Sequence, residues 1–264
     1  MKNKLIAATI SSLLLSAASF AEESAETAKH EYNASAELGF LYKTGNSKSG
    51  DVKTGFDFEH KYAQWTSKLV ANLLYRKTEV EVTEEDGSTS DEFETSDQKL
   101  TINGQTNYTI EADGANYIYG SFGYTDDRFS SFDYQTQASA GWGKRWHNND
   151  VWEFTSDIGP GFKRDRLSAT DTQKSENNDA FIIQAQAAYK RKLNEHVELK
   201  QLVRMTQAFE SDDNSVYIAE TSVTTKLIEE LAMKFSFRVE HNTEVDEGKD
   251  NTDTQTAITL VYSF

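Results

Sequence analysis

Residues 254–264, TQTAITLVYSF, place Ile258, Leu260, Tyr262 and Phe264 at every second position. The positions between them hold smaller or more polar side chains. Because successive side chains of a β-strand point to opposite faces, a period of two predicts an extended strand with one apolar face. The segment also ends the chain on an aromatic residue, which is typical of bacterial outer-membrane proteins.

The same alternation recurs through the chain that precedes this segment. Met233, Phe235 and Phe237 alternate with polar neighbours, and Phe56 and Phe58 do so near the other end. Residues beyond 110 show no apolar stripe at helical spacing. The pattern predicts twelve strands, near residues 32–43, 51–61, 65–76, 98–109, 116–125, 133–146, 150–163, 180–191, 196–208, 215–227, 232–242 and 253–264.

The links between these strands alternate in length. Short links such as His147-Asn148-Asn149 and Leu193-Asn194-Glu195 follow the even strands, and longer polar links follow most odd strands. An even strand count with tight turns at one end and long loops at the other is typical of a transmembrane β-barrel, whose short turns face the periplasm. We therefore predict an all-β, 12-stranded antiparallel transmembrane β-barrel with periplasmic termini. The first hairpin is expected at Gly39 to Asp51.

A soluble β-sandwich is the alternative, because its strands also alternate. Predicted strands of ten to twelve residues favour the membrane, since a tilted strand needs about 9–11 residues to cross a bilayer. Aromatic residues gather at the predicted periplasmic strand ends, as an interfacial girdle requires. They are Tyr32, Tyr62, Trp65, Tyr108, Tyr117, Trp142, Trp146, Trp152, Tyr189, Tyr262 and Phe264.

Composition limits the function classes. The 264 residues include 43 acidic and 27 basic groups and no Cys, which argues against nucleic acid as a partner and excludes a disulfide scaffold. The mean hydropathy of -0.67 excludes a bundle of membrane helices. A barrel accommodates this low value, because only alternate residues of each strand contact lipid.

The first residues are expected to be a targeting sequence that is not part of the folded protein. Lys2 and Lys4 precede an apolar run and a Ser19-Phe20-Ala21 end, which predicts a cleaved secretory signal peptide over residues 1–21. Residues 22–31 are expected to form a short periplasmic segment, and residues 32–264 the barrel. The predicted location is the outer membrane of a Gram-negative cell.

The segment from Gly39 to Ser47 contains a Gly-x-x-x-x-Thr-Gly-Asn-Ser pattern on the first hairpin. Together with Tyr262-Ser263-Phe264, it resembles the YdiY-like family of bacterial outer-membrane proteins, often described as salt-induced and of unknown function. The resemblance implies an outer-membrane barrel linked to salt stress and supplies no catalytic residues. Thr44 to Ser47 are interpreted as a turn.

The predicted inward face carries interleaved acidic and basic residues. Twelve strands enclose a lumen between that of a filled eight-stranded barrel and an open porin. The inward charges could line a narrow conduit for small solutes or ions, or they could pair and plug the barrel. The candidate lumen-lining residues are Glu37, Asp57, Lys68, Arg76, Arg145, Glu153, Asp157, Lys200, Arg204, Glu220, Arg238 and Glu240.

The sequence offers few candidates for metal binding or catalysis. The acidic segment from Thr78 to Asp97 is expected to be a loop that could hold divalent cations, although a solvated anionic surface explains it as well. We expect no metal site, no cofactor and no catalytic residue. An outer-membrane phospholipase is a less favoured alternative, with His241 beside Ser130, Ser131 or Ser222. Pro160, between two glycines, predicts a bulge or a bend in the ladder.

The expected partners follow from the predicted location. They are outer-membrane lipid and lipopolysaccharide, the barrel-assembly machinery through Tyr262-Ser263-Phe264, and small solutes or ions. The first alternative is therefore a channel, and the second is a non-conducting envelope-stability or surface protein with acidic cation-binding loops.

Overall fold

The computed structural model describes residues 29–43, 49–83, 89–111, 114–128, 132–168, 175–210, 213–244 and 251–264. Twelve strands confirm the predicted number. Their bounds are β1 (Glu31–Lys43), β2 (Ser49–Tyr62), β3 (Trp65–Thr83), β4 (Thr89–Thr109), β5 (Asn116–Asp127), β6 (Phe132–Asn148), β7 (Trp152–Leu167), β8 (Glu176–Lys192), β9 (Val197–Ala208), β10 (Val216–Lys226), β11 (Leu231–Asn242) and β12 (Thr252–Ser263).

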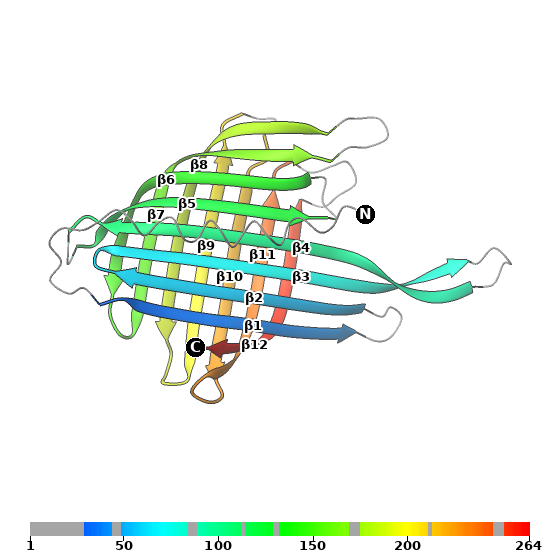
Figure 1. Ribbon diagram of the computed structural model, residues 1–264, viewed down its shortest axis with the longest axis horizontal. Coiled ribbons are helices and arrows are strands. Elements are labelled where there is room, and N and C mark those ends of the chain that lie inside the picture. Colours follow the sequence, from blue (N-terminus) through cyan, green and yellow to red (C-terminus); the bar gives the residue numbers. More distant parts are fainter. Residues whose placement is uncertain are drawn as a thin grey trace.

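The strands form one closed antiparallel barrel in which each strand pairs with its neighbours along the chain. In Figure 1 one wall lies in front and the strands of the other wall cross behind it. β12 closes the barrel on β1 through four residue pairs, from Ser35 opposite Ser263 to Leu38 opposite Leu260. This pairing closes the sheet on itself, so β1 and β12 are not free sheet edges where they pair.

Short turns gather at the end of the barrel that also carries both ends of the described chain. Asn149 accepts hydrogen bonds through its side-chain oxygen from the backbone N–H groups of Val151 and Trp152, at 2.9 and 2.8 Å. Asn194 makes the same contacts to His196 and Val197. Asparagine favours tight turns because its side chain bonds to backbone two or three residues on.

Apolar side chains point outward from the barrel, the reverse of a soluble core. Phe40 is 70% exposed, Phe181 73% and Ile258 61%. The inward positions beside them are polar, with Thr259 and Gln184 almost fully buried. The barrel therefore has the inverted polarity that the strand pattern predicts. Within the described ranges, no helix is long and apolar enough to cross a membrane.

The acidic segment from Thr78 to Asp97 is mostly not a loop, so that prediction was wrong. β3 continues to Thr83 and β4 begins at Thr89, and the two strands project beyond the barrel as a twisted ribbon (Figure 1). The register shifts between Arg76 and Lys77, at the base of the ribbon. Antiparallel pairing satisfies the backbone, so acidic residues at alternating positions can extend the hairpin into water.

The structure decides two further predictions, and three others fall outside the residues it describes. Pro160 causes no bulge, because it pairs with Ile183 in β8 and the β6–β7 register shifts elsewhere. Tyr117 does not join the outer aromatic girdle, because its side chain is inward and only 2% exposed. The predicted signal peptide, the segment 22–28 and the turn Thr44–Ser47 lie outside the described residues.

Candidate functional site

The register of the strands places all twelve candidate lumen residues on the same face of the sheet. Glu37 of β1 lies opposite Gly55, and Gly55 lies opposite Asn72 of β3. Counting by twos along each strand carries this face around the barrel. It includes Glu37, Asp57, Lys68, Arg76, Arg145, Glu153, Asp157, Lys200, Arg204, Glu220, Arg238 and Glu240.

Inward residues of β5 to β8 fill the lumen on one side, which we call the packed side. Tyr117, Asp157, Ile182 and Gln184 are all at most 5% exposed. The hydroxyl of Tyr117 donates to Oδ2 of Asp157 at 3.1 Å, and Nε2 of Gln105 donates to the same oxygen at 3.3 Å. Hydrogen bonds to Asp157 thus hold part of this side together, and a buried ion pair between Lys163 and Asp165, at 2.6 Å, holds another part.

Glycines make room for the packed side. Tyr117 lies opposite Gly143 in the β5–β6 ladder, and a Cβ on Gly143 would overlap the Tyr117 ring. A Cβ on Gly141 or Gly159 would meet the backbone of the facing strand. Such close approach permits a tight bend of the sheet, and β6 curves strongly in Figure 1.

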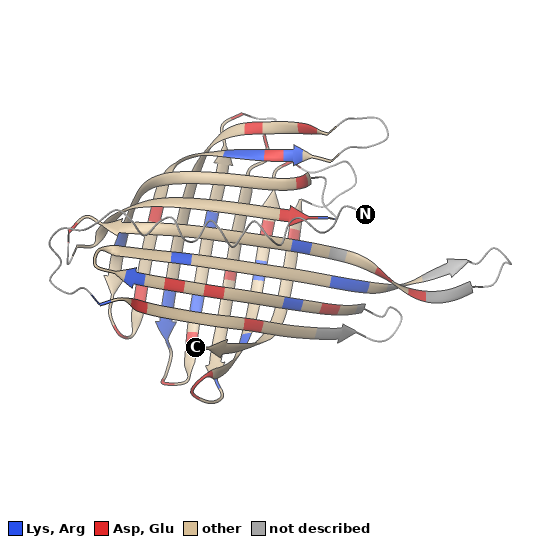
Figure 2. Cartoon of the chain, viewed as in Figure 1, with Lys and Arg blue, Asp and Glu red and all other residues tan. Residues whose placement is uncertain are grey.

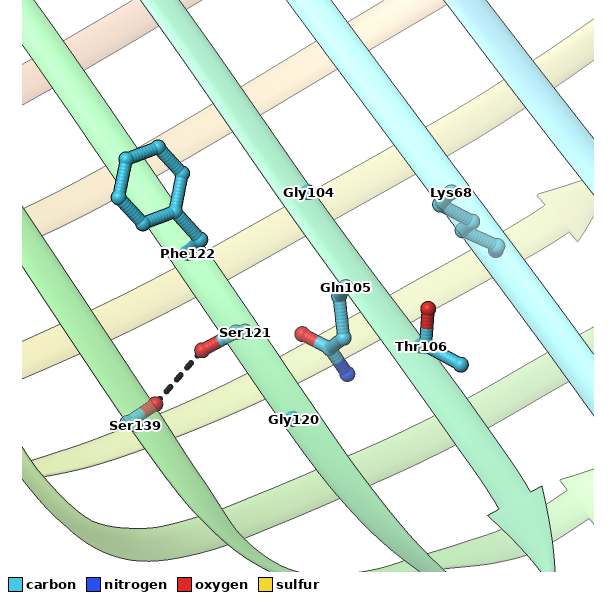
Figure 3. A pocket seen from close by; sticks show the side chains of 8 residues that line it. All are labelled: Lys68, Gly104, Gln105, Thr106, Gly120, Ser121, Phe122 and Ser139. Atoms are coloured by element: carbon cyan, nitrogen blue, oxygen red, sulfur yellow. Dashed lines mark hydrogen bonds between the residues drawn. The ribbon is translucent and has the colours of Figure 1, made fainter. Parts of the chain in front are cut away.

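A hollow of about 370 Å³ adjoins the packed side at β3 to β6. Figure 3 shows its lining, in which Ser121 and Ser139 share a hydrogen bond of 2.6 Å. Lys68 and Gln105 also line it, and Gly104 and Gly120 leave its wall thin. Its polar groups do not form a catalytic arrangement, and no cluster of metal-ligating side chains is present among the described residues.

Inward residues of β9 to β12 and β1 to β4 form the opposite, charged side. Lys234 Nζ lies 2.8 Å from Glu37 Oε1. Arg238 lies 2.7 Å from Glu240 and 3.5 Å from Glu220. Figure 2 shows the two signs interleaved along the strands instead of separated on two walls. Pairing therefore lowers the field that any one charge creates.

Two contacts span the lumen and form what we call the constriction. Arg204 Nη1 of β9 donates to Asn103 Oδ1 of β4 at 3.3 Å. Lys99 of β4 lies 3.5 Å from Glu240 of β11. In the closed strand order, four strands separate β4 from β9 and from β11 along the shorter way round. Side chains from opposite walls therefore meet inside the barrel.

Parts of the charged side are nevertheless open. The side chains of Lys68 and Lys200 are 55% and 56% exposed although both point inward. Their carboxylate neighbours, Glu59 and Glu198, lie at 2.8 and 3.2 Å. Exposed cations on the inner face of a closed sheet indicate space that water can enter.

The remaining candidates lie nearer the barrel ends. Arg76 Nε lies 2.9 Å from Asp51 Oδ1, and Arg145 Nη1 donates to Thr109 Oγ1 at 3.0 Å. Glu153 lies opposite Lys190 in the β7–β8 ladder, and Asp57 opposite Val70 in the β2–β3 ladder. These residues shape the inner surface outside the constriction.

The phospholipase arrangement does not form among the described residues. His241 Nδ1 lies 2.8 Å from Thr252 Oγ1. His241 pairs with Tyr217 across the β10–β11 ladder, whereas Ser222 pairs with Ser236. Five positions along a strand separate the two, which is about 17 Å at 3.4 Å per residue. Ser130 and Ser131 lie outside the described residues.

Comparison with known proteins identifies the family. Residues 36–264 match the family described as "Protein of unknown function, DUF481". The chain belongs to this family. It is also 23% identical over 241 residues to "Uncharacterized protein YdiY" of Escherichia coli (strain K12), covering 90% of this chain and 85% of that protein. The predicted resemblance to YdiY-like proteins is thereby confirmed.

Similar solved structures include the translocator domain of autotransporter NalP from Neisseria meningitidis, with 9% identity and a TM-score of 0.49. That match covers 88% of each chain. The NanC porin structure has 8% identity and a TM-score of 0.48, covering 88% of this chain and 98% of that one.

Sequence reasoning missed several lumen residues of this DUF481 member. Tyr117 and Tyr119 alternate with the outward Ile118, so strict counting by twos would have placed both inside. Tyr117 was instead assigned to the membrane interface, because aromatic residues are enriched there. Lys99, which completes the constriction, begins a predicted strand, where the alternating pattern is least informative.

Proposed function

We propose that this chain is an outer-membrane β-barrel that acts as a narrow channel for small hydrophilic solutes or ions. The outward apolar side chains support the membrane location. Phe40, Phe122, Phe181 and Ile258 are all more than half exposed, and exposed apolar area of this kind is unfavourable in water and favourable against lipid.

The observation that carries the channel proposal is the pair of exposed inward lysines. Lys68 and Lys200 keep more than half of their side-chain surface accessible on the inner face. Each has a carboxylate neighbour, yet the large accessible surface of both side chains indicates that water reaches them on the inner face. The path for solutes would follow the charged side and pass Arg204 and the Lys99–Glu240 contact.

A non-conducting envelope protein is the second candidate, because of the constriction itself. The Arg204–Asn103 and Lys99–Glu240 contacts cross the lumen. If they persist in the membrane, the barrel would be plugged, and the protein would serve envelope stability through its wall and its acidic outer ribbon. Loss of such a protein would change sensitivity to detergent or salt.

Planar-bilayer recording of the purified protein distinguishes the candidates. The channel proposal predicts discrete conductance steps. Replacing both partners of the Lys99–Glu240 contact, in a Lys99→Ala with Glu240→Ala double variant, should increase the conductance because it removes one contact across the lumen. Arg204→Glu or Arg238→Glu should alter ion selectivity. Absence of conductance in the wild type and in the double variant would favour the envelope candidate.

The remaining parts of the proposal concern biogenesis and setting. Cleavage after Ala21 would deliver residues 22–31 and the barrel to the periplasm, where Tyr262-Ser263-Phe264 would engage the barrel-assembly machinery. Lipid and lipopolysaccharide would surround the wall, and expression would respond to salt. Fractionation of cells that produce the wild-type chain or a chain lacking Phe264 tests this route. Deletion of Phe264 should reduce the amount of the protein in the outer-membrane fraction.

A further inference from the structure

Arg204 differs in its partners from Arg76 and Arg238, the lumen arginines that pair with carboxylates. Its Nε donates to Gln186 Oε1 at 2.9 Å and its Nη1 donates to Asn103 Oδ1 at 3.3 Å. Both acceptors are neutral amides. Within the described part of the chain, no carboxylate lies within 4.0 Å of its guanidinium. A guanidinium has five N–H donors, so three of them have no protein acceptor in these contacts.

Arg238 provides the contrast within the same lumen. Its guanidinium lies 2.7 Å from Glu240 and 3.5 Å from Glu220, so two carboxylates neutralise it. Lys234 is likewise neutralised by Glu37 at 2.8 Å. Arg204 thus carries a positive charge at the constriction that no close carboxylate offsets.

The surroundings of Arg204 favour an additional anion. The nearest inward carboxylate of the facing strand, Glu220, lies two positions beyond Ile218, the residue opposite Arg204, and is already paired with Arg238 at 3.5 Å. The two amide partners fix the plane of the Arg204 guanidinium, which reduces the entropy cost of binding. A planar guanidinium with free donors matches a carboxylate in two parallel hydrogen bonds.

We infer that Arg204 forms an anion-binding subsite at the constriction and that the solutes it selects are small organic carboxylates. This inference rests on the proposed channel function and names its solute class. Two carboxylates occupy inward positions near Arg204: Asp157 shares a row of the sheet with it through Gln186, and Glu220 lies two positions from Ile218, the residue opposite Arg204. They keep the subsite weak, and weak binding suits a residue that must release each passing solute.

Gluconate and sorbitol form a suitable probe pair, because they have similar size and differ chiefly in the carboxylate. In liposomes containing the wild-type barrel, gluconate should enter faster than sorbitol. Arg204→Gln should abolish that preference, and Arg204→Lys should retain part of it because the charge remains without the planar fork. Lys144→Gln removes one positive charge from the outer face, where the Lys144 ammonium lies 4.7 Å from the centre of the exposed Trp146 ring, so it serves as the charge-matched control and should leave the preference intact.

Calorimetric titration of the folded barrel in detergent with gluconate or inorganic phosphate separates the subsite from the channel. Gluconate binding that Arg204→Gln abolishes supports the subsite even if no solute crosses, in which case only the channel proposal fails. Phosphate binding equal to gluconate binding would overturn the assignment to carboxylates. Solute entry without a gluconate preference, or gluconate binding unchanged in a correctly folded Arg204→Gln variant, would overturn the subsite while leaving the channel in place.

Discussion

The packed side and the charged side of the lumen differ in how their inward polar side chains are stabilised. On the packed side, Tyr117 and Gln184 are 2% and 3% exposed and the groups around them bond mainly through neutral donors. On the charged side, Lys68 and Lys200 are more than half exposed beside carboxylates. The difference shows that one wall fills the barrel with its own side chains, whereas the other keeps charged side chains accessible to water.

The comparison also explains where glycine is needed. Gly143 faces Tyr117, and a side chain there would occupy the space of the ring. On the charged side glycines also give clearance, but to smaller side chains: a Cβ on Gly39 would meet the Thr259 side chain at 2.7 Å and one on Gly55 the Asn72 side chain at 3.1 Å. Close packing around Tyr117 determines the arrangement of side chains on the packed side, and the pairing of charges determines it on the charged side.

Lys234→Ala should have the largest effect on stability. The substitution leaves Glu37, which is 7% exposed, without its cation at 2.8 Å. Breaking a buried pair costs about 3–5 kcal/mol, because the remaining charge is uncompensated. Denaturant unfolding of the barrel in lipid vesicles measures the loss. Restored stability in Lys234→Ala with Glu37→Gln is expected, and a single variant as stable as wild type would refute the pairing.

Gly143→Val should come next and acts on the packed side. The added Cβ would overlap the Tyr117 ring, and overpacking costs up to about 3 kcal/mol. Gly120→Ala is the matched control, because a Cβ there meets nothing within 4 Å. Unfolding midpoints of the two variants should differ clearly, and equal midpoints would contradict the close packing.

Tyr117→Phe should have a smaller effect. It removes the 3.1 Å hydrogen bond to Asp157, whose Oδ1 already lacks a partner among the described residues. Leaving a buried acceptor less satisfied costs about 1–2 kcal/mol. Asp157→Asn in the same chain should recover part of the loss. A loss that Asp157→Asn leaves unchanged would show that the hydrogen bond contributes little.

Lys200→Ala should have the smallest effect on stability. Its side chain is 56% exposed and lies 3.2 Å from Glu198, and exposed ion pairs contribute about 0–1 kcal/mol. The same unfolding assay applies. A loss as large as that of Lys234→Ala would show that Lys200 depends on its ion pair as strongly as the buried Lys234 does, contrary to its exposure.

Much of this architecture could be predicted from alternation alone. The outward Ile258 and Leu260 and the inward Glu37 follow from counting by twos, and closure follows because an unpaired edge is costly in lipid. The ribbon of β3 and β4 was missed because acidic residues suggested a loop, although paired backbone tolerates them in water. The constriction could not be predicted, because contacts such as Arg204–Asn103 join strands that are not neighbours and depend on barrel diameter.

Cysteine accessibility tests the division of the lumen most directly, because the chain contains no native Cys. Lys200→Cys and Gln184→Cys would each be exposed to a small charged thiol reagent in the reconstituted barrel. This division of the lumen predicts rapid modification at position 200, on the charged side, and strong protection at position 184, on the packed side. Equal rates at the two positions, with both variants folded, would contradict it.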